Sequence, residues 1–570
     1  DMIATGNYQA GAGAGFLATG GNRTFSGVLT DTSNGALALV KGGEDTLELT
    51  GANTYTGGTV VREGTLSLGA ADALPADTVV TLGGGGTGGA LVLNGYSQQV
   101  SGLQTAGAGG ATSRLVNGSG TAATLTVDVA AGVLNRFAGT LGGSGTDENN
   151  FDLVKQGQGT LVLSGTNTYS GGTTVDAGVL AIMTTAALPG WNTNGSYTVA
   201  SGAALAVGSG VSDVDVATIL GTTNLQAGAA FGFHVDAGAT RVFAGQVVDT
   251  PNGALPMVKI GGGTLSLTAE NAYTGGTMVR EGTVQLGVAN ALPTGSVLTL
   301  GQGGASGMLR LNGFNQQLAG LLIEGTAGTA NRVVNGSSTA ATITLDIAAG
   351  QTGTFAGMFG GNASNENNLS VVKQGEGTFR LGAASTHTGG TTVREGTLSL
   401  GIANALPTSS TVTLGGDGTS GTFALNGYSQ QLGRLAIAGT AGADNRVING
   451  GSTAATLTLS IGSEQTQTFG GTLGGPGANE NNFSLLKSGA GTLVLSAANT
   501  YTGGTTIRAG TVQLGRANAL PAGSAVTLGY DDTSSANADT SGTLALNGFD
   551  QQVSGIRVVR ATGAANRVIN

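Results

Sequence analysis

Short runs of alternating apolar and polar residues recur along the whole chain. Examples are TVVREGTLSLG at residues 59–69, ATLTVDVA at 123–130 and TLVLSG at 160–165. Alternation with a period of two, bounded by Gly, Asn or Asp, is typical of β-strands, because successive side chains of a strand point to opposite faces. No segment shows a helical period with end caps. The pattern therefore predicts an all-β chain with a strand about every 8 to 12 residues.

A seven-residue segment, NTYTGGT at residues 53–59, marks a long repeat. Near-copies begin at residues 167, 271, 385 and 499, so the intervals are 114, 104, 114 and 114 residues, and we number the five copies by these marks. The Asn is expected in a turn, where it tolerates an unusual φ and bonds neighbouring backbone, and the Tyr is expected to cover the end of a core layer. The predicted structural positions are Asn53, Tyr55, Asn167, Tyr169, Asn271, Tyr273, Asn499 and Tyr501.

All the lysines of the chain follow the same spacing. They are Lys41, Lys155, Lys259, Lys373 and Lys487. A catalytic lysine would not need five copies, so we predict solvated turn positions multiplied by duplication. Ion pairing or crosslinking between chains is the alternative. His387 stands where the other marks have Tyr, in STHTGGT, and is predicted to be a drifted structural residue.

Closely spaced strands fit two architectures, which are a string of antiparallel sandwiches and a parallel β-helix. Separate domains would need linkers, and none appears between the copies. Asn-Gly and Gly-Gly steps fall at similar places in successive segments, as expected when turns stack on turns. We therefore predict a parallel β-helix (a solenoid) that forms one continuous rod, with residues 1–570 as one continuous β-helical repeat region.

The repeat breaks in two places. The second copy, at about residues 170–260, is shortened and divergent, and it holds the single Trp of the chain, Trp191. The fifth copy inserts an acidic loop, YDDTSSANAD, which contains Asp531 and Asp532. If the chain makes a specific contact, we predict that it lies at these three residues, although a tolerated loop is the simpler interpretation.

Composition narrows the choice of partners. Glycine supplies 107 of 570 residues and charged residues only 9%, with a formal net charge of −10. An acidic chain offers no basic surface for phosphate backbones, so a nucleic-acid partner is not expected. No run approaches about 18 consecutive apolar residues, so no transmembrane helix and no membrane insertion by this segment are expected.

Candidate catalytic and metal-binding groups are few. His234 and Asp236 are two residues apart, which a strand places on one face as a matter of course, and a serine-protease triad is not predicted. Zinc is not expected without cysteine. The acidic loops TDENN, SNENN and ANENN could supply some calcium ligands, but hydrated loops are the simpler interpretation. We predict no catalytic residue, no cofactor and no metal.

The run KQGQGTLVLSGTNTYSGGTTVDAGVLAI, at residues 155–182, closely resembles the passenger-associated transport repeat of bacterial autotransporters. Residues 487–521 resemble it equally well. The resemblance implies a right-handed parallel β-helix that is exported across an outer membrane and displayed or released outside the cell. It also implies an N-terminal signal peptide and a C-terminal β-barrel translocator, so we expect the chain to be a segment of a longer polypeptide.

Together these observations predict a non-enzymatic, extracellular repeat protein that forms an adhesin stalk or a structural fibre. Its expected partners are other copies of itself, joined end to end or laterally, or ligands on host cells, matrix or cell surfaces. Two alternatives remain open. One is a secreted toxin or receptor-binding passenger, and the other is a β-helical polysaccharide-degrading enzyme.

Overall fold

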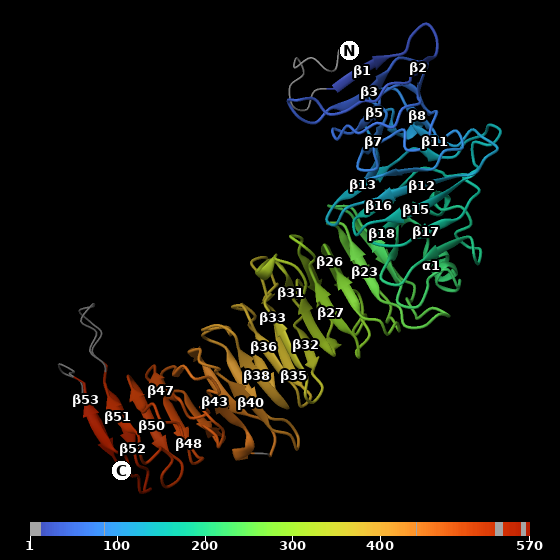
Figure 1. Ribbon diagram of the computed structural model, residues 1–570. Coiled ribbons are helices and arrows are strands. Elements are labelled where there is room, and N and C mark those ends of the chain that lie inside the picture. Colours follow the sequence, from blue (N-terminus) through green and yellow to red (C-terminus); the bar gives the residue numbers. More distant parts are fainter. Residues whose placement is uncertain (1–12, 85, 441, 530–539, 560–565) are drawn as a thin grey trace. The chain divides into compact units, whose positions relative to one another are not determined.

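The computed structural model describes residues 13–84, 86–440, 442–529, 540–559 and 566–570 (Figure 1). These residues are nearly all parallel β-structure, with about 22 stacked turns that form a β-solenoid. The predicted fold class is thus confirmed. The chain divides into two compact units, Asp1–Leu265 with Asn271–Met278, and Ser266–Glu270 with Val279–Asn570. One continuous repeat region over residues 1–570 stays a prediction.

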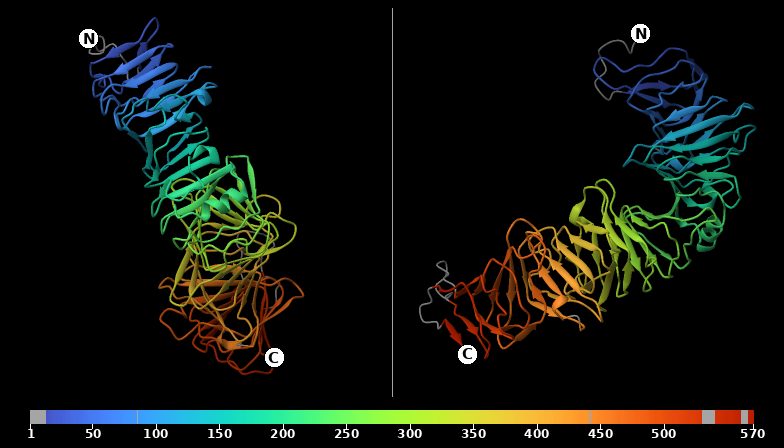
Figure 2. Two further views of the ribbon diagram at one scale, coloured as in Figure 1. Left: turned by 90° about the vertical axis from the view of Figure 1, so that its right-hand side faces the viewer. Right: turned by 60° about the horizontal axis from the view of Figure 1, so that its bottom comes forward.

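Strand pairs within each unit show how the sequence pattern produces the stack. In β44 (Ala455–Ser460) and β47 (Phe483–Ser488), buried and half-buried residues alternate without interruption. The two strands pair in parallel, so Leu457 lies beside Leu485 and Leu459 beside Lys487. Each turn therefore buries its apolar face on the same face of the next turn, as a solenoid requires. Figure 2 shows this stacking of strands in each unit from two further sides.

The first unit contains three complete sheets, with strand orders β1-β3-β5-β7-β10, β14-β11-β8-β6-β4-β2 and β19-β17-β15-β12-β9, and the series β13-β16-β18-β20-β21-β23. The strands up to residue 260 are β1 Gly13–Leu17, β2 Arg23–Phe25, β3 Ala38–Gly42, β4 Thr46–Leu49, β5 Thr59–Val61, β6 Gly64–Leu68, β7 Val79–Leu82, β8 Gly89–Val92, β9 Gln98–Val100, β10 Gly102–Thr105, β11 Arg114–Val116, β12 Ala123–Asp128, β13 Leu134–Phe137, β14 Thr140–Leu141, β15 Phe151–Gln156, β16 Thr160–Leu163, β17 Thr173–Val175, β18 Val179–Thr184, β19 Tyr197–Val199, β20 Ala204–Gly210, β21 Ala230–His234, β22 Thr240–Phe243 and β23 Met257–Ile260.

The second unit repeats this arrangement, with strand orders β29-β32-β35-β37-β39-β42, β33-β36-β38-β40-β43-β46, β41-β44-β47-β49-β51-β53 and β45-β48-β50-β52-β54. The remaining strands of the chain are β24 Thr264–Leu267, β25 Thr277–Val279, β26 Gly282–Leu286, β27 Val297–Leu300, β28 Gly307–Arg310, β29 Gln316–Leu318, β30 Gly320–Ile323, β31 Arg332–Val334, β32 Ala341–Asp346, β33 Thr352–Phe355, β34 Met358–Phe359, β35 Leu369–Gln374, β36 Thr378–Leu381, β37 Thr391–Val393, β38 Gly396–Leu400, β39 Thr411–Leu414, β40 Gly421–Ala424, β41 Gln430–Leu432, β42 Arg434–Ile437, β43 Arg446–Ile448, β44 and β47 as given above, β45 Thr466–Phe469, β46 Thr472–Leu473, β48 Thr492–Leu495, β49 Thr505–Ile507, β50 Gly510–Leu514, β51 Ala525–Leu528, β52 Gly542–Ala545, β53 Gly555–Val558 and β54 Arg567–Ile569.

The corners between strands depend on left-handed backbone. In the LNG segments, Asn94, Asn312 and Asn426 each have a φ of 53°, which Asn tolerates better than most residues. Gly64 has a φ of 65°, and a Cβ at this position would collide with the carbonyl oxygen of Gly43 in the preceding turn. The Gly of REGT is therefore required both by its backbone conformation and by the close approach of the neighbouring turn.

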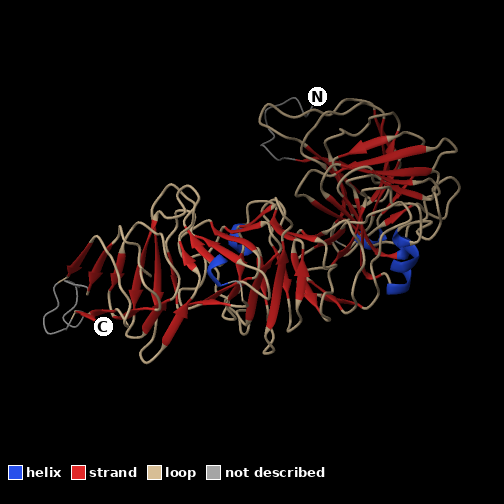
Figure 3. Cartoon of the chain, turned by 90° about the horizontal axis from the view of Figure 1, so that it is seen from below, coloured by secondary structure: helices blue, strands red, loops and turns tan. Residues whose placement is uncertain are grey.

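One α-helix, α1 (Asp213–Leu220), occurs among the residues that the structure describes, where the sequence predicted none (Figure 3). The Oγ of Ser212 accepts a hydrogen bond from the backbone N–H of Asp215, and the Asp215 carboxylate accepts one from the backbone N–H of Ser212. This capping box satisfies two of the N–H groups at the start of the helix. The expectation that no segment has a helical cap was wrong here, because Ser-Asp-Val-Asp is itself a cap signal in the divergent second copy.

Candidate functional site

In four of the five repeat marks, a Tyr is buried and bonded inside its own turn. In the fifth copy, the hydroxyl of Tyr501 lies 2.6 Å from Oγ1 of Thr505, the last residue of the mark. The same pairs occur in three other copies, namely Tyr55–Thr59 at 2.6 Å, Tyr169–Thr173 at 2.5 Å and Tyr273–Thr277 at 2.5 Å. Burial raises the pKa of Tyr169 to about 12. These phenols are inaccessible to an external ligand, which favours a structural role.

The Asn of the mark joins three successive turns. Its Oδ1 in Asn499 accepts a hydrogen bond from Leu473 N at 2.7 Å, and its Nδ2 donates to the carbonyl oxygen of Ala519 at 2.7 Å. Asn53, Asn167 and Asn271 accept equivalent bonds from the turn before. The predicted backbone bonding is therefore present. The unusual φ is not, because none of these four residues is among the described residues with a positive φ.

The fourth copy keeps this geometry with different side chains. His387 is buried, and its Nε2 lies 2.9 Å from Oγ1 of Thr391, in the place of the Tyr–Thr pair. Burial lowers the pKa of His387 to about 4, so the imidazole is neutral at neutral pH. Ser385 replaces the Asn and accepts from Phe359 N at 3.4 Å, a much longer bond. The predicted equivalence of His387 and the Tyr positions agrees with this placement.

The lysines lie inside the stack, so the prediction of solvated turn positions is wrong. Lys487 is fully buried, and its Nζ donates to the carbonyl oxygens of Ser488 at 2.8 Å, Gly489 at 2.6 Å and Ala509 at 3.2 Å. The other four lysines are equally buried and donate to the carbonyls that follow them, and they are Lys41, Lys155, Lys259 and Lys373. Each ammonium donates hydrogen bonds to backbone carbonyls at a corner where a strand ends, so these carbonyls are not left without a partner.

Loss of hydration lowers the pKa values of four of these ammonium groups. Burial lowers the pKa of Lys155, Lys373 and Lys487 to about 8, and it also lowers the pKa of Lys41. Groups buried at this depth cannot reach a neighbouring chain. The alternative of ion pairing or crosslinking between chains therefore has no support from their positions.

The ENN loops use their polar groups internally. Oε2 of Glu148 accepts from Gly145 N at 2.8 Å, and Oδ1 of Asn149 accepts from Gly143 N at 2.8 Å. The guanidinium of Arg114 lies 3.2 Å from the Glu148 carboxylate. Within the described ranges, no group of three or more His, Asp or Glu side chains is placed to hold a metal ion. The arrangement fastens the loop to the stack.

The divergent second copy presents the predicted contact residue Trp191 in a turn. Trp191 is half-buried, and its backbone N–H donates to the carbonyl oxygen of Leu188 at 3.2 Å. It follows a short 3-10 helix, Thr185–Ala187. Asp531 and Asp532 lie outside the described residues. The role of Trp191 as a contact residue therefore stays a prediction.

Two other features of this copy carry charge. The buried Arg241 donates to the carbonyl oxygens of Gly208 and Val211, which precede α1 in the chain, and lies 4.9 Å from the Phe233 ring centre. His234 and Asp236, noted in the sequence, meet at 3.1 Å, and Arg136 pairs with Asp236 at 2.6 Å. Burial lowers the pKa of His234, which favours the neutral imidazole beside the Arg136–Asp236 ion pair.

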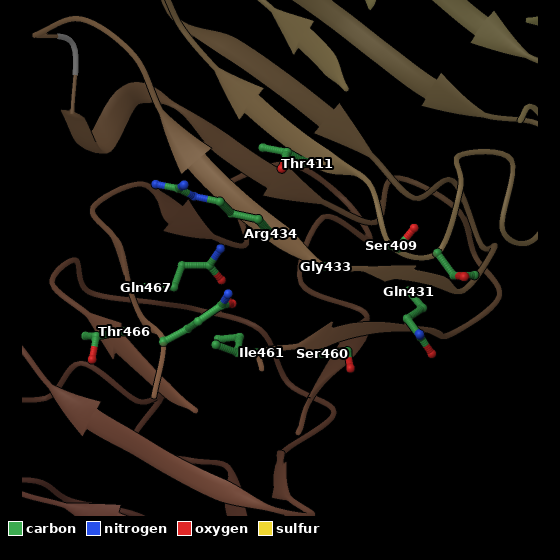
Figure 4. A pocket seen from close by; sticks show the side chains of 11 residues that line it. Ser409, Thr411, Gln431, Gly433, Arg434, Ser460, Ile461, Thr466 and Gln467 are labelled. Carbon is green, nitrogen blue, oxygen red and sulfur yellow. The ribbon is translucent and has the colours of Figure 1, made fainter. Parts of the chain in front are cut away.

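A polar hollow of about 650 Å³ opens in the fourth copy, and we call it the Arg434 groove (Figure 4). Its lining includes Ser409, Thr411, Gln431, Arg434, Ile461 and Gln467. A second hollow of about 620 Å³ lies beside Arg394, Glu395 and Asp417. Neither was predicted, because each is assembled from turns that are distant in sequence.

Comparison with known proteins identifies the repeat. Five segments match the Passenger-associated-transport-repeat family, at residues 39–68, 153–182, 257–286, 371–400 and 485–514. Each of these segments contains one lysine and one NTYTGGT-type mark. No solved structure gives a significant match. In the described part of the chain, no helix is long and apolar enough to cross a membrane.

A protein of Brucella suis, named Adhesin BmaC autotransporter, is 30% identical to the chain over 519 residues. The match covers 87% of this chain but only 13% of that relative, so the chain spans a small part of the relative's length.

Proposed function

Because the chain belongs to the autotransporter passengers that carry passenger-associated transport repeats, we propose that it is a non-enzymatic adhesive scaffold. Membership of this family gives it a location at the bacterial cell surface or outside the cell. The repeated turns would act as a spacer, and surfaces where the repeat departs from its pattern would contact ligands on cells or matrix.

The observation that carries this proposal is the internal use of the repeated polar groups. The mark's Tyr and Asn and the lysines are bonded within the stack, as described for Tyr501, Asn499 and Lys487. The repeated groups, which are five lysines and four copies each of the Tyr and the Asn, contribute to stability and present nothing reactive to a substrate. Catalysis at these positions would need an acid or base that can reach a substrate. Side chains that are buried and hydrogen-bonded within the stack cannot reach one.

The relative supports the adhesive part of the proposal. That relative is named as an adhesin, and the similarity extends over most of this chain. A rigid stalk or a self-assembled fibre is the further form we propose for the scaffold, since parallel stacking gives a regular, stiff core.

Attachment of the purified chain tests the proposal. Beads coated with the chain should bind cultured cells or immobilised matrix in a saturable manner, and excess soluble chain should compete. Beads coated with the heat-unfolded chain serve as the control. Absence of saturable binding to every cell and matrix surface, with folding verified by circular dichroism, would contradict an adhesive role. Electron microscopy of the same sample distinguishes single rods from threads and so tests fibre assembly.

A further inference from the structure

The Arg434 groove combines groups from three separate turns. Thr411 begins β39, Arg434 begins β42, and these two residues pair directly in the parallel register. Gln467 comes from β45, and Ile461 follows β44. Figure 4 shows Arg434 and Gln467 on one side of the groove and Ser409 and Gln431 on the other, with Ile461 below Gln467 in this view. Hydroxyl, amide and guanidinium groups thus line one polar hollow.

An unsatisfied acceptor lines this groove. Gln467 is 6% exposed, and its Oε1 has no hydrogen-bond partner among the described residues. The hydroxyl of Ser410, the residue between Ser409 and Thr411, is also buried without a partner there. At the same position in the third and fifth copies, Ser296 and Ser524 donate to proline carbonyls at 2.7 and 2.9 Å. A buried, unpartnered amide oxygen is costly unless a bound group donates to it.

The cation is also available for a ligand. Within the described residues, the Arg434 guanidinium makes no hydrogen bond and no ion pair. A guanidinium binds a carboxylate through two parallel N–H···O bonds. The neighbouring hydroxyls and amides suit a ligand rich in hydroxyl groups.

We propose that the Arg434 groove binds an acidic saccharide, through a sugar carboxylate on Arg434 and sugar hydroxyls on Gln467 and the groove's hydroxyls. The net charge of −10 argues against a dense polyanion, because such a ligand would be repelled by the chain as a whole. One guanidinium matches one carboxylate. The proposal rests on the adhesive function proposed above and names a ligand class for it.

The other copies supply matched variants. The position of Arg434 is occupied by glycine at the start of the equivalent strands, at Gly102, Gly320 and Gly555. The position of Gln467 is glycine in the third copy, at Gly353. The substitutions Arg434→Gly and Gln467→Gly therefore install residues that the same fold already contains, so both variants are expected to fold.

Titration of the whole 570-residue chain with soluble sugars tests the proposal. The probes are sialyllactose and a hyaluronan tetrasaccharide, two sources of a sugar carboxylate, and lactose is the neutral control. Saturation-transfer NMR and calorimetry should show that at least one acidic probe binds, and that lactose binds at least about tenfold more weakly. Arg434→Gly should lower the affinity for the acidic probe by about tenfold or more, and Gln467→Gly by about threefold or more.

The proposal is overturned if neither acidic probe binds at concentrations up to about 10 mM, or if Arg434→Gly binds as tightly as the unaltered chain. Equal binding of lactose would also overturn it, since the carboxylate would then play no part. Because soluble sugars are measured without any surface, failure here leaves the bead-attachment result intact. An adhesive chain with a different ligand is thereby distinguished from a chain that is not adhesive.

Discussion

The marks of the fourth and fifth copies perform the same task with different residues. The fifth has Asn499 and Tyr501, and the fourth has Ser385 and His387. Both bury an aromatic ring that reaches a Thr hydroxyl four residues later, at 2.6 Å in the fifth copy and 2.9 Å in the fourth. The backbone bond from the turn before lengthens from 2.7 Å at Asn499 to 3.4 Å at Ser385.

This difference shows which part of the mark the fold requires. The ring-to-hydroxyl contact and the two glycines are kept in both copies, while the Asn bridge is weakened. A binding site multiplied for avidity would preserve exposed groups instead. The fourth copy therefore keeps its turn although its mark has a weaker bond to the preceding turn. Each of its two residue differences from the fifth copy can be reversed by substitution.

The largest effect is expected from removing the ring in the fifth copy. Tyr501→Ala should destabilise its local turns by about 3–5 kcal/mol, because a fully buried ring leaves a cavity. Hydrogen exchange of peptides around residues 485–514 measures this loss. Tyr501→Phe is the control and should cost only about 1 kcal/mol, for the hydroxyl bond to Thr505. Equal losses for the two variants would show that the bond, and not the ring, holds the turn.

The next largest difference between the two copies is expected in their stability at acid pH. The folded-state pKa of His387 is about 4, below its usual 6.5, so the unfolded chain binds more protons between these values. Stability of the fourth copy is therefore complete above pH 6.5 and falls by about 3 kcal/mol as the pH drops to 4. Hydrogen exchange across this range should show the loss near residues 371–400. His387→Tyr should remove it, and persistence in that variant would contradict the assignment.

Substitution of the lysines should not distinguish the copies. Lys487→Met leaves three corner carbonyls without a donor and should cost about 2 kcal/mol, after allowance for the relieved burial of a charge. Lys373→Met in the fourth copy should cost the same, because Lys373 donates to the corresponding carbonyls. Thermal unfolding followed by hydrogen exchange measures the loss of stability in both variants. A solvated lysine would give no change in either copy.

The smallest effect concerns the Asn bridge. Asn499→Ser should weaken the fifth copy by about 1 kcal/mol, because the serine would keep only a long bond to the preceding turn. The reverse change, Ser385→Asn, should stabilise the fourth copy by a similar amount. Exchange rates of the Leu473 and Phe359 amides report the two bonds directly. A change of the same sign in both variants would contradict the comparison.

The sequence pattern was sufficient to predict the solenoid, because alternation within strands and the spacing of turns are local properties. The same alternation would have placed Lys487 inward, since it keeps the register of Phe483 and Leu485 in FSLLKS. The prediction followed the usual preference of lysine for solvent and missed the carbonyls that a sharp corner leaves unpaired. The constant Thr at the end of every mark was likewise a readable signal for the partner of the Tyr.

Two features depended on tertiary structure. The Arg434 groove is assembled from residues of three turns, and its unsatisfied oxygen follows from how those turns pack. The segment that precedes α1 depends on Arg241, which is far from Gly208 in sequence but donates to its carbonyl. Local periodicity carries no information about such long-range contacts, whereas the helix cap at Ser212 was present in the sequence.

The central claim is that the repeat marks are scaffold and that ligand contacts lie elsewhere. Bead attachment of the Ser385→Asn/His387→Tyr variant, measured beside the unaltered chain, tests it most directly. The account predicts equal saturable attachment to cells or matrix for the two proteins at neutral pH, together with slower hydrogen exchange in the fourth copy of the variant. Loss of attachment in a variant that is folded and more stable would contradict the claim, because it would place the ligand contact at the mark itself.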